Sequence, residues 1–514
     1  MPFMLTFMLW TSILAAQPKS FSKKEKENYW NAEDLFEVKD YYSASKILAD
    51  LYKKHDGYAP LNYKLAVSYY KLKDAPNASN FFEKTKNDYP DSYFYLAKIY
   101  LENEDTKKAL KALNEFSKAK SPTEFHSKDA EKLRNTIAYA EQAIANPENV
   151  TIENLGPNIN TVYAEYVPVI TIDEQTMYFT SRRMHKNNKI DPTGQPFEDI
   201  YMSEKTADGW GKAVLLPGDV NTDLHDACVG LSSNGDIMFT FKTSENFFGN
   251  LYQSTRKNGK WSKPEKMGKN INGEQSNETS ASISMDGNTI YFSSDREGGY
   301  GGFDIYRVVK LPNGVWSEAK NLGPTINTEY NEEAPFIHPD GNSLYFSSEA
   351  HENMGGYDVF VSRKTDEGWT NPKNLGYPTN TTKDDIFFVI TPDERHGYYS
   401  TEKEDGYGLQ DIYMINYLEK RLRSSVVKGL AKDKSTGKPI VAVASLMEVE
   451  SGSLQGLYKS RERDGNFIML FDPNVKYVLL VEANGYENII QEYSFSEEDL
   501  LGSQKIEVEM TPSK

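Results

Sequence analysis

MDGNTIYFSSDREGGYGGFDIYRV, residues Met285–Val308, decides the fold because the chain repeats this stretch several times. It opens with a turn at Asp286-Gly287, forms an alternating strand, crosses a glycine-rich loop and enters a second strand at Asp304. The second-strand triplet recurs at spacings of 51, 54, 54 and 53 residues, as Asp199-Ile200-Tyr201, Asn250-Leu251-Tyr252, Asp304-Ile305-Tyr306, Asp358-Val359-Phe360 and Asp411-Ile412-Tyr413. A period of roughly 50 residues, filled with short strands and turns, predicts one propeller blade for each repeat.

The first and last repeats differ from the others in a way that predicts how the ring closes. Four repeats carry a tryptophan strand, at Trp210, Trp261, Trp316 and Trp369, whereas the fifth ends after Tyr413 without one. The phrase at Asn321–Asn327 (NLGPTIN) also stands before the first repeat, at Asn154–Asn160. We therefore predict a five-bladed WD40-like β-propeller over residues 150–420, closed by a strand near Val150 to Leu155 that completes the last blade. A sixth, degenerate blade is the alternative.

Residues 24–146 have helical periodicity instead of strand alternation. A small residue followed one turn later by a large one recurs at Ala44 and Leu48, at Ala78 and Phe82, and at Ala109 and Leu113. Small residues let two helices of a hairpin approach, and the larger residue fills the remaining space. The pattern resembles tetratricopeptide (TPR) repeats, with residues 129–145 as a capping helix. It departs from that family at Lys71 and Lys73, where the family often has glycine.

The C-terminal residues 425–514 read as short strands separated by tight turns, such as Thr436-Gly437 and Asp464-Gly465. This segment resembles the carboxypeptidase regulatory-like domain, which implies a small transthyretin-like β-sandwich. The predicted fold class is therefore multidomain, with α-helical repeats followed by two all-β domains.

Composition restricts the compartment and the partners. An apolar run ending at Ala15-Ala16 fits a signal peptide over residues 1–16, which predicts export to the periplasm. The single cysteine, Cys228, excludes an intrachain disulfide framework. The net charge is -17; residues 21–150 hold 21 basic and 21 acidic side chains, and residues 151–514 hold 36 basic and 54 acidic ones. The excess of acidic side chains in the C-terminal part repels the phosphates of nucleic acid and therefore disfavours binding to it.

The sequence shows no pattern typical of a catalytic, cofactor-binding or metal-binding site, so we expect a protein that is not an enzyme. The seven histidines show no metal-ligand spacing, and Gly230-Leu231-Ser232-Ser233-Asn234-Gly235 lacks the spacing of a nucleophile elbow. The recurrent aspartates Asp199, Asp304, Asp358 and Asp411 are expected to cap the preceding loops, with a calcium ion as the alternative. Cys228 near His225 is expected to be a buried, inert thiol.

The remaining candidates are residues that could contact a partner. The tyrosine stripes of the helical part are either packing core or the lining of a groove for a partner segment. Aromatic residues of the propeller loops could stack on glycan or peptidoglycan fragments, and two loops differ most between repeats, the insertion Met184–Phe197 and the loop Glu349–Tyr357. The candidate partner-binding residues are Tyr63, Tyr70, Tyr95, Tyr100, His185, Tyr300, Tyr357 and Tyr407.

The repeats resemble the WD40-like repeats of the TolB family, through Pro339-Asp340-Gly341, Tyr345-Phe346-Ser347-Ser348 and Gly355-Gly356. The order of TPR repeats, propeller and regulatory-like sandwich resembles PorE-type periplasmic accessory proteins of Bacteroidota type IX secretion and gliding. That resemblance implies a periplasmic scaffold, associated with the outer membrane, that docks an outer-membrane barrel or another secretion component. The OmpA-like domain that usually follows in that family has no counterpart pattern before Lys514. Either the gene is truncated or this member does not itself bind the cell wall, which argues against direct peptidoglycan binding.

Overall fold

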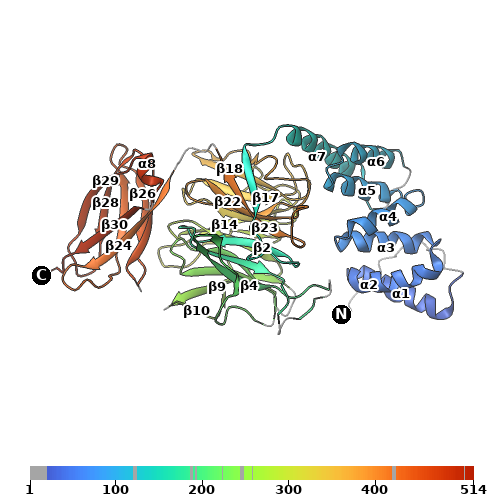
Figure 1. Cartoon of the computed structure of the whole chain (residues 1–514), viewed down its shortest axis with the longest axis horizontal. Helices are drawn as coiled ribbons and strands as arrows, with labels where there is room; N and C mark the ends of the chain where they lie inside the picture. The colour runs from blue at the N-terminus through green and yellow to red at the C-terminus, as the bar shows by residue number, and fades with distance from the viewer. Residues whose placement is uncertain are drawn as a thin grey trace, which may run out of the picture. The chain divides into compact units, whose positions relative to one another are not determined.

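The computed structural model describes residues 20–119, 124–185, 189–191, 194–222, 224–243, 248–257, 259–418, 424–462, 464–502 and 504–513. The predicted signal peptide, residues 1–16, lies outside these residues. Helices make up the N-terminal part and strands make up almost all of the rest (Figure 1). Contacts divide the chain into two compact units, Met1–Ile137 with Ile190–Gln195, and Ala138–Lys189 with Pro196–Lys514.

The helical part consists of successive hairpins followed by one longer helix. The helices are α1 (Lys23–Glu37), α2 (Tyr41–His55), α3 (Ala59–Lys71), α4 (Ala75–Thr85), α5 (Asp91–Glu102), α6 (Thr106–Lys118) and α7 (Ser127–Ala145). Ala44, Ala78 and Ala109, the small residues of the repeated pattern, are fully buried where the two helices of each hairpin meet. The sequence pattern therefore identified the packing positions correctly.

Each hairpin turns through the same backbone conformation. Lys39, Lys73 and Glu104 have φ angles of 63°, 61° and 57°, in the left-handed region that normally favours glycine. An aspartate follows each of them and accepts a hydrogen bond from the backbone of the next helix, for example Asp74 Oδ1 from the N–H of Asn77 at 3.2 Å. The lysine noted at the family's glycine position thus keeps the turn that glycine usually makes.

Replacing Lys73 with glycine is expected to stabilise the helical part. A non-glycine residue in the left-handed region costs about 1–2 kcal/mol, and the greater freedom of glycine in the unfolded chain returns part of that gain. We expect Lys73→Gly to raise the free energy of unfolding by about 0.5–1 kcal/mol in urea titrations followed by circular dichroism. Lys73→Ala is the matched control, since it removes the same side chain and keeps the strained φ angle; an equal gain in both variants would contradict the argument.

The described strands between residues 150 and 417 form five antiparallel sheets. The first sheet holds β2 (Glu165–Ile170), β3 (Thr176–Ser181), β4 (Asp199–Thr206), β5 (Gly209–Trp210) and β6 (Val214–Leu215); the second holds β7 (Asp226–Leu231), β8 (Ile237–Thr243), β9 (Gly249–Lys257), β10 (Lys260–Trp261) and β11 (Glu265–Lys266); the third holds β12 (Glu278–Ile283), β13 (Thr289–Ser294), β14 (Asp304–Val309) and β15 (Lys320–Asn321); the fourth holds β16 (Glu332–Ile337), β17 (Ser343–Ser348), β18 (Asp358–Thr365), β19 (Gly368–Trp369) and β20 (Lys373–Asn374); and the fifth holds β21 (Ile386–Ile390), β22 (His396–Thr401), β23 (Asp411–Tyr417) and β1 (Val150–Asn154).

The first strands of these sheets form a closed cycle of contacts, from β2 through β7, β12, β16 and β21 back to β2. The last sheet joins the two ends of the region, because β1 pairs with β23 from Val150 opposite Tyr417 to Asn154 opposite Tyr413. The predicted closing strand is therefore present, in the predicted place. It covers an edge that β23 would otherwise expose.

An asparagine at the end of the repeated phrase, buried in four of the five copies, ties each linking segment to a strand. Asn327 accepts a hydrogen bond from the N–H of Ile305 (2.8 Å) and donates one to its carbonyl oxygen (3.0 Å). The same bidentate contact joins Asn160 to Ile412, Asn221 to Ile200, Asn272 to Leu251 and Asn380 to Val359. The phrase thus repeats because each copy satisfies a strand-edge peptide group that would otherwise be buried without a partner.

The C-terminal strands form two further sheets. One has the order β27 (Asn466–Phe471), β24 (Ser425–Asp433) and β30 (Gln504–Met510), and the other has β26 (Leu454–Lys459), β25 (Val443–Glu448), β28 (Lys476–Glu482) and β29 (Ile489–Ser494), with the short helix α8 (Glu497–Leu500) before β30. Both sheets contribute to one buried cluster, for example Val427 and Phe467 from the first and Leu446 and Leu479 from the second. Within the described residues, no helix has the length and apolar character needed to cross a membrane.

Candidate functional site

Three of the candidate tyrosines, Tyr63 and Tyr70 on α3 and Tyr95 on α5, form one aromatic surface, which we call the tyrosine face. The ring of Tyr95 lies edge-on to Tyr70, with centroids 5.0 Å apart. Tyr63 stacks on Tyr89 with centroids 4.4 Å apart. Tyr63 and Tyr70 are seven residues apart and therefore lie on the same side of α3, and the contact of Tyr70 with Tyr95 turns this side toward α5.

A segment of the chain itself lies on the tyrosine face. The carboxylate of Glu124 accepts hydrogen bonds from the hydroxyls of Tyr95 (2.6 Å) and Tyr63 (3.3 Å). The next residue, Phe125, stacks on Phe94 with centroids 4.0 Å apart. The tyrosine face therefore binds an acidic residue followed by an aromatic one, both from the segment that leads into α7.

The backbone of this segment is held by a buried carboxylate. Asp91, at the start of α5, is 1% exposed and accepts hydrogen bonds from the N–H groups of Glu124 and Phe125, each at 3.3 Å. A carboxylate that accepts two backbone N–H groups holds a segment by its main chain, whatever side chains that segment carries. The site thus has a backbone anchor beside hydroxyl donors that hold one acidic side chain and a ring that stacks on one aromatic side chain.

The side of the face near the hairpin turns is cationic. Burial lowers the pKa of the Lys71 ammonium, and the neighbouring charges of Lys98, Lys39 and Lys73 lower it further, while Glu124 opposes the shift. The Nζ of Lys98 lies 5.8 Å from the ring centre of Tyr70. Several ammonium groups beside phenol donors favour a carboxylate at this place.

Tyr95 is covered by the chain's own Glu124, and a partner would reach this tyrosine only by displacing that residue. The side chain of Tyr95 is 1% exposed, and burial together with the charge of Glu124 raises its pKa well above the usual value. Tyr70 and Tyr100 are partly exposed, and their hydroxyls donate to Glu102 and Glu83. Sequence reasoning missed Asp91, Glu124 and Phe125, because Asp91 reads as an ordinary first residue of a helix and the other two lie between periodic segments.

The glycine-rich loops of the five-sheet region are built around the recurrent aspartates. Asp304 Oδ2 accepts the N–H of Tyr300 (2.6 Å), and Asp411 Oδ2 accepts the N–H of Tyr407 (2.6 Å). Asp358 caps its loop in the same way, through the N–H of Met354 at 2.8 Å. The expected capping role is therefore confirmed at these three positions. It leaves the rings of Tyr300 and Tyr407 52% and 46% exposed.

Tyr357 differs from these two tyrosines, because it lies next to Asp358 and its hydroxyl donates to Glu333 Oε1 at 3.2 Å. Glu333, on the first strand of the fourth sheet, also accepts a hydrogen bond from Thr279 at 3.0 Å. Burial raises the pKa of Glu333 from 4.5 to about 6, aided by the charges of Glu349 and Asp295 and opposed by the two hydroxyl donors. Tyr357 is therefore partly buried, with its hydroxyl bound to Glu333, and its ring is poorly placed for stacking on a ligand.

The raised pKa of Glu333 predicts a pH dependence of stability. Because the folded-state pKa is about 6 and the ordinary value is 4.5, the folded protein binds the proton more tightly than the unfolded chain. The contribution of Glu333 is therefore most favourable below pH 4.5 and is lost as the pH rises through 6. Glu333→Gln, which cannot ionise, is expected to raise the melting temperature at pH 7.5 and to change it little at pH ~4.5; an equal gain at both pH values would contradict the assignment.

His185 lies in the insertion of the first sheet, and its Nε2 is 2.7 Å from Asp199 Oδ2. Asp199 is the recurrent aspartate of this repeat, and it contacts a histidine side chain, whereas Asp304, Asp358 and Asp411 each accept a backbone N–H of their loop. The pair borders a cavity of about 220 Å³ that is also lined by Phe197 and Leu224. Part of the insertion, residues 186–188 and 192–193, lies outside the described residues.

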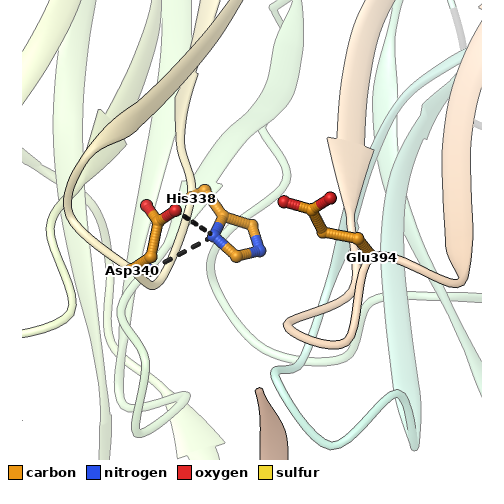
Figure 2. Close-up of side chains that lie close together, drawn as sticks. All are labelled: His338, Asp340 and Glu394. Atoms are coloured by element: carbon orange, nitrogen blue, oxygen red, sulfur yellow. Dashed lines mark hydrogen bonds and ion pairs between the residues drawn. The ribbon is translucent and has the colours of Figure 1, made fainter. Parts of the chain in front are cut away.

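Within the described residues, one group has three side chains whose donor atoms could meet at a metal ion: His338, Asp340 and Glu394 (Figure 2). Nδ1 of His338 lies 3.2 Å from the backbone N of Asp340 and 3.3 Å from Asp340 Oδ2, so contacts within the turn already engage this atom. Burial tends to raise the pKa of Asp340, but His338, Ser343 and the N–H of Asn342 lower it well below its usual value. The cluster is arranged as a hydrogen-bonded turn, and we assign no ion to it.

Cys228 is fully buried, and burial raises the pKa of its thiol to about 12. A thiol that stays protonated at neutral pH is a poor nucleophile. The expectation that Cys228 is buried is confirmed, and its raised pKa agrees with the expected lack of reactivity.

Comparisons with known proteins identify one part of the chain. The tetratricopeptide repeat model matches residues 62–92 and 91–119, which include α3, α4, α5 and α6 and therefore the tyrosine face. No curated protein matches the chain.

Solved structures resemble the chain only distantly. A putative TolB from Agrobacterium tumefaciens is 14% identical, with 63% of this chain and 97% of that one covered and a TM-score of 0.32. The α-L-arabinofuranosidase PaAbf62A from Podospora anserina, in complex with cellotriose, is 14% identical, with 51% and 92% covered and a TM-score of 0.33. At these scores the likenesses carry no argument. The chain thus has tetratricopeptide repeats, which suggest protein–protein interaction, followed by a large all-β region.

Proposed function

We propose that this chain is a non-enzymatic periplasmic scaffold that docks proteins of the cell envelope. One observation carries the proposal: the tyrosine face holds the segment Glu124–Phe125 through a backbone anchor at Asp91 and two tyrosine hydroxyls. A surface with these donors has the chemistry to receive a polypeptide segment of a partner. The partner segment would carry an acidic residue next to an aromatic one and would compete with residues 124–125.

We also propose the finer architecture and relationship that the sequence suggests. The cycle of five sheets, closed by β1, fits a five-bladed WD40-like propeller, and the two C-terminal sheets around one core fit a transthyretin-like sandwich. With the helical repeats, this order supports a PorE-type accessory of type IX secretion or gliding. The partner would then be an outer-membrane barrel or another secretion component.

The test is a cross-linking pull-down from the native envelope with the full chain and with a chain that lacks residues 21–146. We expect the full chain to retain an outer-membrane or secretion protein that the shortened chain loses. The double variant Lys71→Glu, Lys98→Glu reverses charge beside the tyrosine face and should weaken retention, whereas Lys24→Glu, on exposed α1 surface, should not. Retention of the same proteins by the full and shortened chains would contradict docking through the helical part.

The exposed rings of Tyr300 and Tyr407 support a second candidate function, the binding of glycan or peptidoglycan fragments. They occupy equivalent positions in the loops that precede β14 of the third sheet and β23 of the fifth, and both side chains are about half exposed. Sedimentation with purified sacculi tests this candidate. Retention that falls when both tyrosines are replaced by serine would favour it, and no retention of the unmodified chain would remove it.

A further inference from the structure

A second surface lies where the end of α7 and the segment after it meet the third and fourth sheets. The cavity there has a volume of about 930 Å³. Tyr139 lines it from α7, Glu148 from the following segment, His351 and Glu352 from the loop of the fourth sheet, and Lys373 from β20. The loop that supplies His351 and Glu352 is one of the two that differ most between the sequence repeats.

The cavity is lined by two carboxylates that are available to a ligand. The side chains of Glu148 and Glu352 are exposed, and within the described residues neither carboxylate has a hydrogen-bond or ion-pair partner. Lys373 is exposed at the same cavity. Burial keeps the pKa of His351 below its usual value, and its Nε2 lies 3.0 Å from the carbonyl oxygen of Ile326, so the ring adds no charge at neutral pH.

An aromatic residue lies among the acidic groups of this cavity. Burial raises the pKa of the Tyr139 hydroxyl, and the negative charges of Asp358, Glu352 and Glu148 raise it further. An aromatic ring beside carboxylates is a favourable environment for an organic cation, which gains from both. An anion would meet two unpaired carboxylates and only one ammonium group.

The charge of the surrounding region agrees with a cationic ligand. Residues 151–514 carry 36 basic and 54 acidic side chains, so the surface attracts positively charged partners over longer distances. The volume, about 930 Å³, exceeds that of a single amino-acid side chain and leaves room for the neighbouring backbone of a partner.

We propose that this cavity receives a lysine or arginine side chain of a partner polypeptide, with Glu148 and Glu352 as its counter-ions beside Tyr139. The proposal deepens the scaffold function and rests on it, since it names the chemistry that a docking partner presents to the β region. It concerns a different surface from the tyrosine face, which favours an acidic residue.

The experiment uses the full chain and two short peptides, acetyl-Gly-Gly-Lys-Tyr-Gly-amide and its counterpart with glutamine in place of lysine. Isothermal titration calorimetry in low salt is expected to show binding of the lysine peptide at least fivefold tighter than that of the glutamine peptide. The affinity should fall as NaCl is raised from 20 to 300 mM, because exposed charges are screened.

Variants locate the binding. Glu148→Gln and Glu352→Gln are each expected to weaken lysine-peptide binding by about threefold to fivefold, and Lys373→Gln is expected to strengthen it. Glu367→Gln removes the same charge from an exposed position outside the cavity and should leave the affinity unchanged. All four positions are exposed, so the folded state should survive, which circular dichroism verifies.

The proposal is overturned if the two peptides bind equally, if Glu367→Gln weakens binding as much as Glu352→Gln, or if only an uncharged sugar such as chitotriose binds in the cavity. These outcomes differ from a failure of the scaffold function. In the envelope pull-down, the double variant Lys71→Glu, Lys98→Glu changes only the tyrosine face and leaves every residue that lines this cavity in place, so its result can go either way whatever the peptides do.

Discussion

Glu153→Pro is expected to lower the free energy of unfolding of the five-sheet region by about 2–4 kcal/mol, although the side chain it removes is exposed. Glu153 lies in β1 opposite Met414 of β23. The N–H of Leu155 donates to the carbonyl oxygen of Ile412 at 3.2 Å, and alternate residues of an antiparallel strand point the same way, so the N–H of Glu153 faces β23. Proline has no N–H to donate there.

The effect should exceed the loss of one hydrogen bond because β1 joins the two ends of the region. Without this strand, β23 would present an unpaired edge, and the first and last sheets would be linked only through their remaining contacts. Urea unfolding followed by tryptophan fluorescence measures the change, and Glu153→Ala serves as the control, since it keeps the N–H. A proline variant as stable as the alanine variant would show that β1 contributes little to closure.

The sequence was sufficient to predict where the repeats lie and which strand pairs with the end of the last one. Both predictions follow from the internal repeats, because an unclear strand in one copy can be identified from the matching strand in the other copies. The missing tryptophan strand after Tyr413 and the additional phrase at Asn154 pointed to the same pairing, which the register of β1 and β23 confirms. The helical hairpins were predictable for a similar reason, from the buried alanines.

The candidate site was less predictable, because it depends on contacts that do not repeat. Tyr95 has the same sequence environment as its neighbours, but the rings of Phe82 and Phe125 and the carboxylate of Glu124 cover it in the fold. Glu333 resembles any exposed strand residue, yet its pKa depends on Thr279 and Tyr357, which are 54 and 24 residues away in the sequence. Such pairings require the three-dimensional fold, whereas the capping aspartates act within their own loops and could be read locally.

Asn327→Ala is expected to be the most destabilising single substitution considered, at about 3–5 kcal/mol. Asn327 is 1% exposed, and its side chain makes hydrogen bonds to both the N–H and the carbonyl oxygen of Ile305. Its Nδ2 also donates to Asn321 Oδ1 at 2.8 Å. Alanine would leave a buried donor and a buried acceptor of β14 without partners, and each such group costs about 1–3 kcal/mol.

Two further variants separate this polar contact from simple loss of volume. Asn327→Asp keeps an acceptor for the N–H of Ile305 but loses the donor to its carbonyl oxygen and buries a charge, so it should remain strongly destabilised and should improve as the pH falls toward the pKa of the new carboxyl. Asn313→Ala, in an exposed turn of the same repeat, should change the free energy of unfolding by less than about 0.5 kcal/mol. Urea unfolding curves compare the variants. If Asn327→Ala proved as mild as Asn313→Ala, the asparagine would not be what holds the linking segment to the strand, and the repeated phrase would need another explanation.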